Sequence, residues 1–452
     1  MVSVSRFLGT SGLALAFFMA GCGGGGGNGG TVYAPISVSL QVNGAAVTPS
    51  ASGEVAVAPG DSVSIGTDQA STWSTSASDS SAITVAKAST TTQLWSGQLV
   101  NGTTSAVTYT VTATSVNGSG NTKAVVLKVG AGDSRNGSYS VFATNGSNQK
   151  LAINFDTKSL VMTDENNVAA SATISANASE AGTWDITSPL NPNTTNTARL
   201  RVAADGNNIV GSFPFAVAFA SPVRYAVTAF VASRALVTTA AQLDGVYNRL
   251  GIDITATGRD SNIRQVRVRG AGTIFETCNS VAVTAMASCS SFNTYTVTPN
   301  TTAGSWHIVN NADATDIGNF RIAVIGGQNV YFGAGAVVPD GPTRVFRIGP
   351  QDISTFANVT ARGADTLGAW GKADVTSTSL ASTGVDTTGT AYAVNLDLNT
   401  LASIGPLGMR GGTSREIPAN KFFVTQGAKI GAVVGARTNT ATQGYIQIGL
   451  ID

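Results

Sequence analysis

Several arginines crowd one short segment of the sequence, and their spacing could gather guanidinium groups into one site. The segment runs from Arg259 to Arg269 and also contains Arg264 and Arg267. On a β-strand, Arg267 and Arg269 share a face with Gln265. Because guanidinium groups bind carboxylates and phosphates, Arg264, Arg267 and Arg269 form a candidate anion-binding site for sialic acid, a lipopolysaccharide phosphate or another carboxylate. The alternative, which we favour, is an exposed strand face whose charges prevent pairing with another strand edge.

The single histidine, His307, is the one imidazole available as a catalytic base. A serine hydrolase needs a serine, this imidazole and a carboxylate in contact. No Gly-x-Ser-x-Gly motif follows the N-terminal segment. His307 comes directly after Trp306 on a predicted strand, so we expect the two side chains on opposite faces and the histidine at a solvent-exposed or half-buried position. We therefore expect no catalytic residues.

Acidic side chains are sparse and fall mainly in predicted turns, where aspartate accepts hydrogen bonds from backbone amides. This role explains the acidic residues, so a pair of catalytic carboxylates, as in a glycosidase, is not needed to account for them. Asp313 and Asp316 could ligate calcium weakly, but they lack the dense Asp/Asn/Gly spacing of a known calcium loop. The three cysteines are too widely separated for a zinc ribbon, an iron–sulfur cluster or haem attachment. No metal or cofactor is expected. The turn acids are Asp156, Asp205, Asp244, Asp365 and Asp397.

The first residues are typical of an export signal. Arg6 precedes a short apolar run from Leu13 to Ala20 that is too short for a bilayer-spanning helix. The run ends in Met-Ala-Gly-Cys22, which resembles the lipobox of bacterial lipoproteins. The resemblance implies a signal peptide over residues 1–21 and a lipid anchor on Cys22, whose thiol takes a diacylglycerol.

A glycine-rich stretch over residues 22–34 follows and predicts a flexible tether. Lipoproteins of Gram-negative bacteria often carry such a tract, and glycine rather than aspartate after the cysteine resembles an outer-membrane address. We therefore expect a protein anchored in the outer membrane through its lipid and exposed at the cell surface.

Once Cys22 is lipidated, Cys278 and Cys289 remain as an even pair in an oxidising compartment. We expect them to form a structural disulfide. The alternative, a reactive thiol pair, would need a CxxC spacing and basic neighbours, and neither is present.

The composition favours strands and turns. Charged residues make up 11% of the 452 residues, about half the share of an ordinary soluble domain, and there are 52 glycines. Lys and Arg number 26 against 25 acids, a net charge of +1 that gives no signature of nucleic-acid binding. The sequence therefore predicts an all-β fold, and its length suggests roughly three domains.

Residues 35–130 alternate between apolar and polar side chains and contain turn signals such as Asn43-Gly44. About seven short strands in this length resemble a bacterial Ig-like sandwich, although the cysteine pair of that class is absent. Trp73 lies where a central strand would place a core aromatic. Such modules act as spacers or adhesive units.

The remainder predicts three related antiparallel β-units over residues 133–240, 241–350 and 362–452. They are either separate small barrels or sandwiches, or portions of one larger barrel. The second unit carries the cysteine loop as an insertion. The units begin at Gly137-Ser-Tyr139, Gly245-Val-Tyr247 and Gly368-Ala-Trp370; a strand with Trp184 or Trp306 follows in the first two; hairpins over 200–211, 320–330 and 423–431 occur in all three; and 152–160 matches 393–401.

The sequence Ile209-Val-Gly-Ser-Phe213, together with the hairpins and the lipobox, resembles the β-barrel lobes of transferrin-binding-protein-like surface lipoproteins, in which a Val-x-Gly-x-Phe strand recurs. The Gly- and Glu-rich segment that usually follows this strand in the family is replaced here by the stretch from Pro214 to Pro222. We therefore transfer no ligand residues from this family.

These features together predict an all-β, lipid-anchored envelope protein with a non-enzymatic role in surface binding or adhesion. A protein or glycan at the cell surface is the expected partner. Two alternatives stay open, a structural envelope or filament component and an envelope hydrolase assembled from residues of different units.

Overall fold

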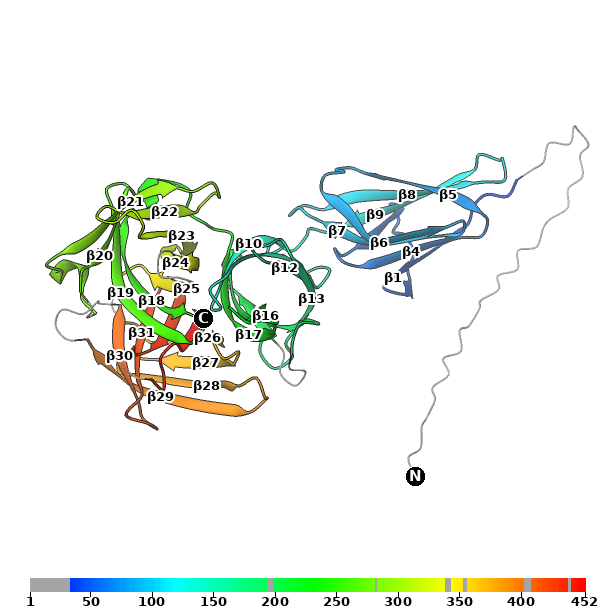
Figure 1. Cartoon of the computed structure of the whole chain (residues 1–452). Helices are drawn as coiled ribbons and strands as arrows, with labels where there is room; N and C mark the ends of the chain where they lie inside the picture. The colour runs from blue at the N-terminus through cyan, green and yellow to red at the C-terminus, as the bar shows by residue number, and fades with distance from the viewer. Residues whose placement is uncertain are drawn as a thin grey trace, which may run out of the picture.

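The computed structural model describes residues 33–192, 198–280, 283–337, 343–352, 356–401, 408–437 and 440–452. An N-terminal pair of sheets is followed by three closed eight-stranded barrels (Figure 1). The prediction of an all-β fold with repeated β-units is confirmed. The signal peptide, Cys22 and most of the tether lie outside the described residues. Within the described ranges, no helix has the length and apolar character needed to cross a membrane.

The N-terminal strands form a five-stranded sheet in the order β2-β1-β4-β7-β6 and a four-stranded sheet in the order β3-β9-β8-β5. Apolar side chains of both sheets pack in one core, including Ile65 and Leu99 from the first and Leu127 from the second. The strands are β1 (Val38–Val42), β2 (Ala45–Ala46), β3 (Glu54–Val57), β4 (Ser62–Thr67), β5 (Ser71–Ala77), β6 (Ile83–Thr91), β7 (Leu94–Asn101), β8 (Val107–Ser115) and β9 (Thr122–Val129).

The core aromatic of these sheets differs from the one expected. Trp73 lies on β5, an edge strand, and is half-buried, with its indole N–H donating to the Thr91 carbonyl at 2.8 Å. Trp95 on β7 is buried instead, at 4% exposure, and its ring lies 6.2 Å from that of Tyr109. Alternation alone could not tell a central strand from an edge strand.

The three β-units are separate barrels. In each, antiparallel strands follow one another around the barrel and the first pairs with the last, so no strand edge stays open. The first barrel contains β10 (Gly137–Ala143), β11 (Asn148–Asn154), β12 (Ser159–Thr163), β13 (Ala169–Ala176), β14 (Thr183–Thr187), β15 (Ala198–Val202), β16 (Asn208–Ala216) and β17 (Tyr225–Ser233).

The second and third barrels repeat this order. The second contains β18 (Gly245–Ile254), β19 (Arg259–Arg269), β20 (Ile274–Cys278), β21 (Phe292–Pro299), β22 (Trp306–Asn310), β23 (Ile317–Ile325), β24 (Gln328–Val337) and β25 (Thr343–Pro350), with short 3-10 turns η1 (Ala240–Leu243) before it and η2 (Met286–Ser288) within it. The third contains β26 (Val359–Asp365), β27 (Trp370–Val375), β28 (Ser379–Val385), β29 (Ala391–Thr400), β30 (Met409–Ser414), β31 (Lys421–Gly427), β32 (Ile430–Gly435) and β33 (Ile446–Ile451).

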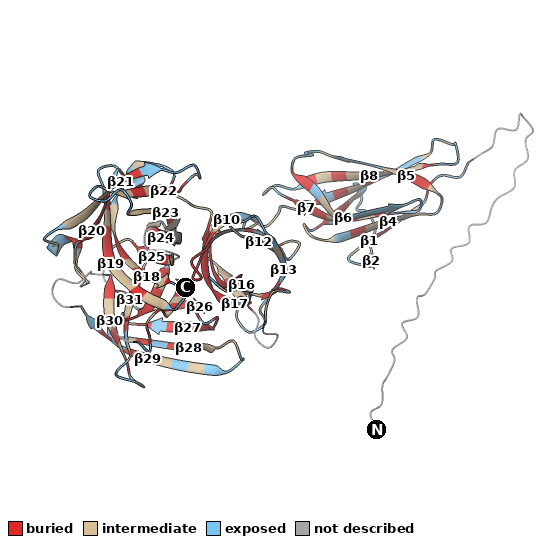
Figure 2. Cartoon of the chain, viewed as in Figure 1, coloured by how far each residue is buried: buried red, intermediate tan, exposed pale blue. Residues whose placement is uncertain are grey.

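The barrels meet at a shared apolar cluster, which we call the central cluster. The first, seventh and eighth strands of each barrel supply most of it, and these wall segments are buried (Figure 2). The Phe142 ring of the first barrel stacks on the Phe332 ring of the second, with centroids 4.7 Å apart and planes 6° from parallel. Members of the central cluster include Phe142, Val210, Ala229 and Val231 from the first barrel, Leu250, Ile252, Phe332 and Phe346 from the second, and Trp370, Ile430, Ile446 and Ile448 from the third.

The interiors of the barrels differ. The first is filled by large apolar side chains, among them Tyr139, Phe213 and Phe230. The second and third barrels each contain a sizeable cavity, of about 840 Å³ and about 530 Å³. An eight-stranded barrel is just wide enough to be filled by side chains or to hold one small ligand, and this protein contains both kinds.

Candidate functional site

The cavity of the second barrel lies in the part of its interior that the core does not fill, and it extends to Asn148 and Glu165 of the first barrel. Aromatic and aliphatic side chains pack the rest, and Leu243 of η1 is part of that packing. The cavity wall is largely polar. It includes Asn262 on β19, Tyr295 on β21, Asn319 on β23 and Tyr331 on β24, together with charged side chains.

Two arginines face this cavity side by side. Arg249 on β18 and Arg264 on β19 are direct cross-strand partners in the antiparallel pair, and both line the cavity. Strand alternation explains the placement, because Arg249 shares a face with the buried Tyr247 and Arg264 shares one with the buried Val266. Like charges directly opposite each other in a sheet are destabilising. The barrel therefore carries an electrostatic cost at this position.

A third arginine in the cavity is already neutralised. Arg347 on β25 is 7% exposed, forms an ion pair with Asp253 and donates to the Ile252 carbonyl. Burial by itself would raise the pKa of Asp253, but the charge and hydrogen bond of Arg347 outweigh it and hold the pKa below its usual value. Asp253 thus forms its ion pair with Arg347 and interacts with Arg249 and Arg264 through their charges alone.

The other acids at the cavity are also engaged. Asp260 pairs with Arg437 at 2.8 Å, and Glu165 pairs with Arg344 at 2.9 Å. Asp316 accepts hydrogen bonds from the Tyr295 hydroxyl and the Asn310 amide, both at 2.8 Å. Burial, and then Asp316, raise the pKa of Tyr295 to about 12.

The Arg249–Arg264 pair is left without an acidic partner in the described part of the chain. Arg249 donates one hydrogen bond, to the Asn262 side-chain oxygen at 3.2 Å, and its Nε is buried without a partner. Arg264 makes no hydrogen bond or ion pair with a described residue. Burial and the neighbouring Arg249 charge lower the pKa of Arg264. These two guanidinium groups can therefore donate hydrogen bonds to an anion that enters the cavity.

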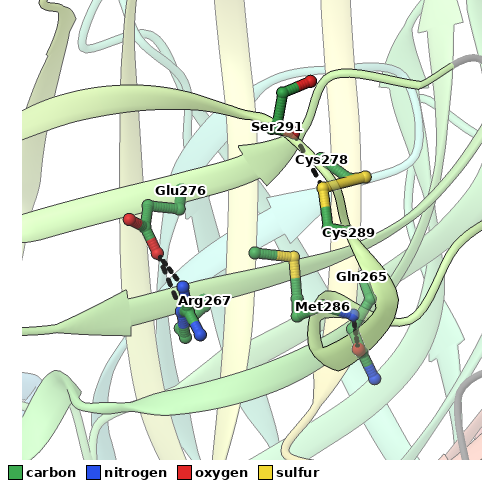
Figure 3. Close-up of a disulfide and its surroundings, with 7 residues drawn as sticks. All are labelled: Gln265, Arg267, Glu276, Cys278, Met286, Cys289 and Ser291. Carbon is green, nitrogen blue, oxygen red and sulfur yellow. Dashed lines mark hydrogen bonds and ion pairs between the residues drawn. A yellow bond between two sulfur atoms is a disulfide. The ribbon is translucent and has the colours of Figure 1, made fainter.

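The three arginines proposed from the sequence are not brought together. Arg267 and Arg269 lie on the outer face of β19, where both bind the carboxylate of Glu276, at 2.6 and 2.7 Å (the Arg267 bond is drawn in Figure 3). The hydrogen bond from Arg269 is the largest influence on Glu276, and with Arg267 it lowers the pKa of this buried acid below its usual value despite burial. Because side chains alternate along a strand, Arg264 faces the cavity whereas Arg267 and Arg269 face outward.

Cys278 and Cys289 are joined by a disulfide, with Cα atoms 5.7 Å apart (Figure 3). The bridge closes the connection between β20 and β21, which spans residues 279–291, against 164–168 and 386–390 in the other barrels. In the closed loop, the Met286 N–H donates to the Gln265 side-chain oxygen at 2.6 Å (Figure 3). Gln265 also donates to Asp352 at 2.9 Å. The loop therefore packs on the outer wall of the barrel, away from the cavity.

The remaining candidate residues do not form a reactive site. His307 is half-buried on β22, opposite in direction to the core residue Trp306, and contacts the Asn319 side chain at 3.3 Å. Asp313 accepts hydrogen bonds from Thr315 in an exposed turn. Within the residues that the structure describes, no three His, Cys, Asp or Glu side chains are grouped to hold a metal ion.

Most of the turn acids act as expected. Asp156, Asp205, Asp244 and Asp365 accept backbone N–H groups. Asp397 instead lies within β29 and pairs with Arg415 at 2.7 Å.

Sequence reasoning missed Arg249, the more informative half of the pair. Its signal was present, because Tyr247, Arg249, Gly251 and Asp253 alternate along one strand and Tyr247 is an aromatic of the core. Locating its partner also required the register of β18 against β19, which places Arg249 opposite Arg264.

Comparisons with known proteins do not assign the chain to a family. No family model matches the chain, and no curated protein matches it. One solved structure, a quinonprotein alcohol dehydrogenase-like protein from Bacteroides thetaiotaomicron VPI-5482, aligns over 88% of this chain and 96% of its own at 8% identity. The TM-score is 0.15, so this likeness carries no argument about fold or function.

Proposed function

We propose that the chain is a lipid-anchored cell-envelope protein with a non-enzymatic binding role, and that its second barrel binds an acidic sugar. The observation that carries the proposal is the Arg249–Arg264 pair, two adjacent guanidinium groups that face a cavity without an acidic partner among the described residues. An anion between them would relieve both their repulsion and their partial loss of hydration. Guanidinium groups match the planar geometry of carboxylates.

The rest of the cavity favours a sugar over an apolar anion. Its volume of about 840 Å³ lies in the range of small-molecule sites. Amide and hydroxyl side chains line it, including Asn262 and Thr277, which can hydrogen-bond to hydroxyl groups. The Tyr295 ring, which is only partly buried, offers flat apolar surface against which a sugar ring can pack.

Replacing Arg264 by glutamine is expected to weaken binding of an acidic sugar roughly tenfold or more, because a hydrogen bond to a charged group contributes about 1.5–3 kcal/mol. The measurement is isothermal titration of the folded protein with N-acetylneuraminate and glucuronate. Glucose, which lacks the carboxylate, is expected to bind more weakly than glucuronate.

Arg269→Gln provides the matched control. It removes an arginine from the same strand on the outer face, and Arg267 stays paired with Glu276. Equal binding by the Arg264→Gln and wild-type proteins would contradict the proposal, as would failure of both acidic sugars to bind the wild type.

The envelope location rests on the lipobox and glycine tract, and the N-terminal sheets fit it as an Ig-like spacer. Two sheets packed around one core support that class. A spacer between the tether and the barrels would hold the binding sites away from the membrane.

Protease added to intact cells is expected to digest the wild-type protein. The Cys22→Ala variant is expected to lose its membrane association, because the thiol is the point of lipid attachment. Immunoblots of intact and lysed cells make the measurement. Protection in intact cells with digestion after lysis would contradict surface binding and favour a structural role inside the envelope.

A further inference from the structure

We infer that the interior of the third barrel is a second binding site, which takes an apolar small molecule with a hydrogen-bond donor at one end. This site is separate from the arginine pair and does not depend on the sugar proposal. Its cavity of about 530 Å³ lies within the range of small-molecule sites. The two cavities differ in chemistry, so the protein would bind two classes of ligand.

The inner part of this cavity is apolar. Leu380 on β28 and Leu396 on β29 line it with Phe422 on β31 and Val433 on β32. All four side chains are buried at less than 10% exposure and belong to one core cluster. Phe356 is also in this cluster, ahead of the first strand. An apolar group placed against these side chains is removed from water, which is the main source of affinity in such sites.

Polar side chains gather at the end of the barrel where β26 stops and β33 begins. The Tyr445 hydroxyl donates to one carboxylate oxygen of Asp365 at 3.2 Å, and the other oxygen accepts the Leu367 and Ala369 amides at 2.8 and 3.0 Å. Gln447 donates to the Ser382 hydroxyl at 3.3 Å. These groups give the cavity an amphipathic form, with an apolar interior and a hydrogen-bonding mouth.

Two glycines make room for a tyrosine in this mouth. Gly371 and Gly384 are cross-strand partners, and a Cβ on either would lie 2.9 or 2.7 Å from the Tyr392 hydroxyl. The Tyr392 hydroxyl therefore lies against bare backbone, where it is buried without a hydrogen-bond partner among the described residues, and Tyr392 lines the cavity. Burial raises the pKa of Tyr392 to about 12, so it is a neutral hydrogen-bonding group at physiological pH.

The mouth favours a donor over an acid. Asp365 is 4% exposed, and the oxygen that faces Tyr445 retains capacity for a second hydrogen bond. A hydroxyl or amine can donate there, whereas a carboxylate would meet the Asp365 charge. Burial raises the pKa of Asp365 to about 6, so this repulsion acts at pH 8 and is relieved at pH 5. The other charged or titratable groups at the cavity are Tyr392, Tyr445, Asp386 and Arg259 of the second barrel.

The rim has a further apolar element. Leu367, in the turn between β26 and β27, is 66% exposed and lines the same cavity. Arg259 donates to the carbonyl of the adjacent Thr366 at 3.5 Å, which ties the second barrel to this turn. A ligand entering here would cover Leu367.

The test uses N-phenyl-1-naphthylamine, an uncharged apolar probe with one N–H donor, and the full folded protein. A saturable rise in probe fluorescence with one site per chain is expected. Leu396→Trp, which fills the apolar interior, should weaken probe binding at least tenfold, whereas Val168→Trp, at an exposed position of the first barrel, should leave it unchanged. Circular dichroism and thermal unfolding confirm that both variants are folded.

Competition identifies the head group. At pH 8, decanol and decylamine should displace the probe and decanoate should compete at least tenfold less well. At pH 5 decanoate should displace the probe more effectively than at pH 8. Asp365→Asn, which keeps the cavity and removes the charge, should strengthen decanoate competition at pH 8, where decanoate itself is fully ionised. Absence of saturable probe binding, or unchanged binding in a folded Leu396→Trp variant, would overturn the site. Equal competition by decanol and decanoate at pH 8 would overturn its donor preference.

Discussion

Replacing Phe332 by alanine is expected to lower the free energy of unfolding by about 3–5 kcal/mol, the range found for truncating a buried aromatic side chain. Phe332 is fully buried in the central cluster, and its ring stacks on Phe142 of the first barrel. The truncation removes apolar contacts in two barrels at once. Urea unfolding, followed by tryptophan fluorescence, measures the loss.

The same experiment tests whether the barrels stabilise one another. If they do, Phe332→Ala should also separate their unfolding transitions, and the double variant with Phe142→Ala should cost less than the two single changes added together. Val168→Ala, at a side chain 62% exposed, is the control and should change stability by less than about 0.5 kcal/mol. A Phe332→Ala variant within about 1 kcal/mol of the wild type would mean that each barrel is stable by itself.

The sequence located the elements that local patterns define. The predicted hairpins occupy the sixth and seventh strands of every barrel, as β15–β16, β23–β24 and β31–β32. The two predicted tryptophan strands, with Trp184 and Trp306, are both fifth strands. These elements could be recognised because a tight turn between two alternating strands leaves a signal within about a dozen residues.

The sequence was a poorer guide to which strands correspond in different barrels. The expected start of the third unit at Gly368 precedes β27, a second strand, whereas Gly137 and Gly245 begin first strands. The first strand of the third barrel begins at Val359, ahead of the expected boundary at residue 362. The matched segments 152–160 and 393–401 also occupy different strand positions in their barrels. Short strands with similar alternation resemble one another whatever their position in a barrel.

The candidate sites depended on information that a single strand does not contain. Parity along β19 separates Arg264 from Arg267 and Arg269, but only barrel closure makes one face an interior. The cavity of the third barrel had no sequence signal, because Asp365, Tyr392 and Tyr445 come from segments far apart in the chain. Asp365 is the one residue of this cavity that the sequence analysis names, and it accepts turn amides as predicted. Its burial among apolar side chains follows from the closed sheet.

Replacing Asp365 by asparagine is expected to stabilise the protein at pH 8 by up to about 3 kcal/mol, the equivalent of a pKa raised from 3.8 to about 6. Burial is the main cause, and the Ala369 and Leu367 amides offset only part of it. The folded state therefore holds a proton that the unfolded chain has lost between about pH 4 and pH 6. Stability from this group falls as pH rises through that window and stays low above it. Urea unfolding from pH 4 to pH 8 measures both effects.

Asp386, at the rim of the same cavity, provides a contrast of opposite sign. The Thr388 hydroxyl is the main cause that lowers its pKa, so its charged form stabilises the fold at pH 8 and this contribution is lost as pH falls. Asp386→Asn should therefore reduce stability at pH 8, whereas Asp365→Asn should increase it and flatten the decline between pH 4 and pH 6. An asparagine can still accept the Leu367 and Ala369 amides through its side-chain oxygen, so the comparison isolates the charge. If Asp365→Asn were no more stable than the wild type at pH 8, the buried carboxylate would carry no electrostatic cost, and the mouth of the third barrel would have no reason to prefer a donor over an acid.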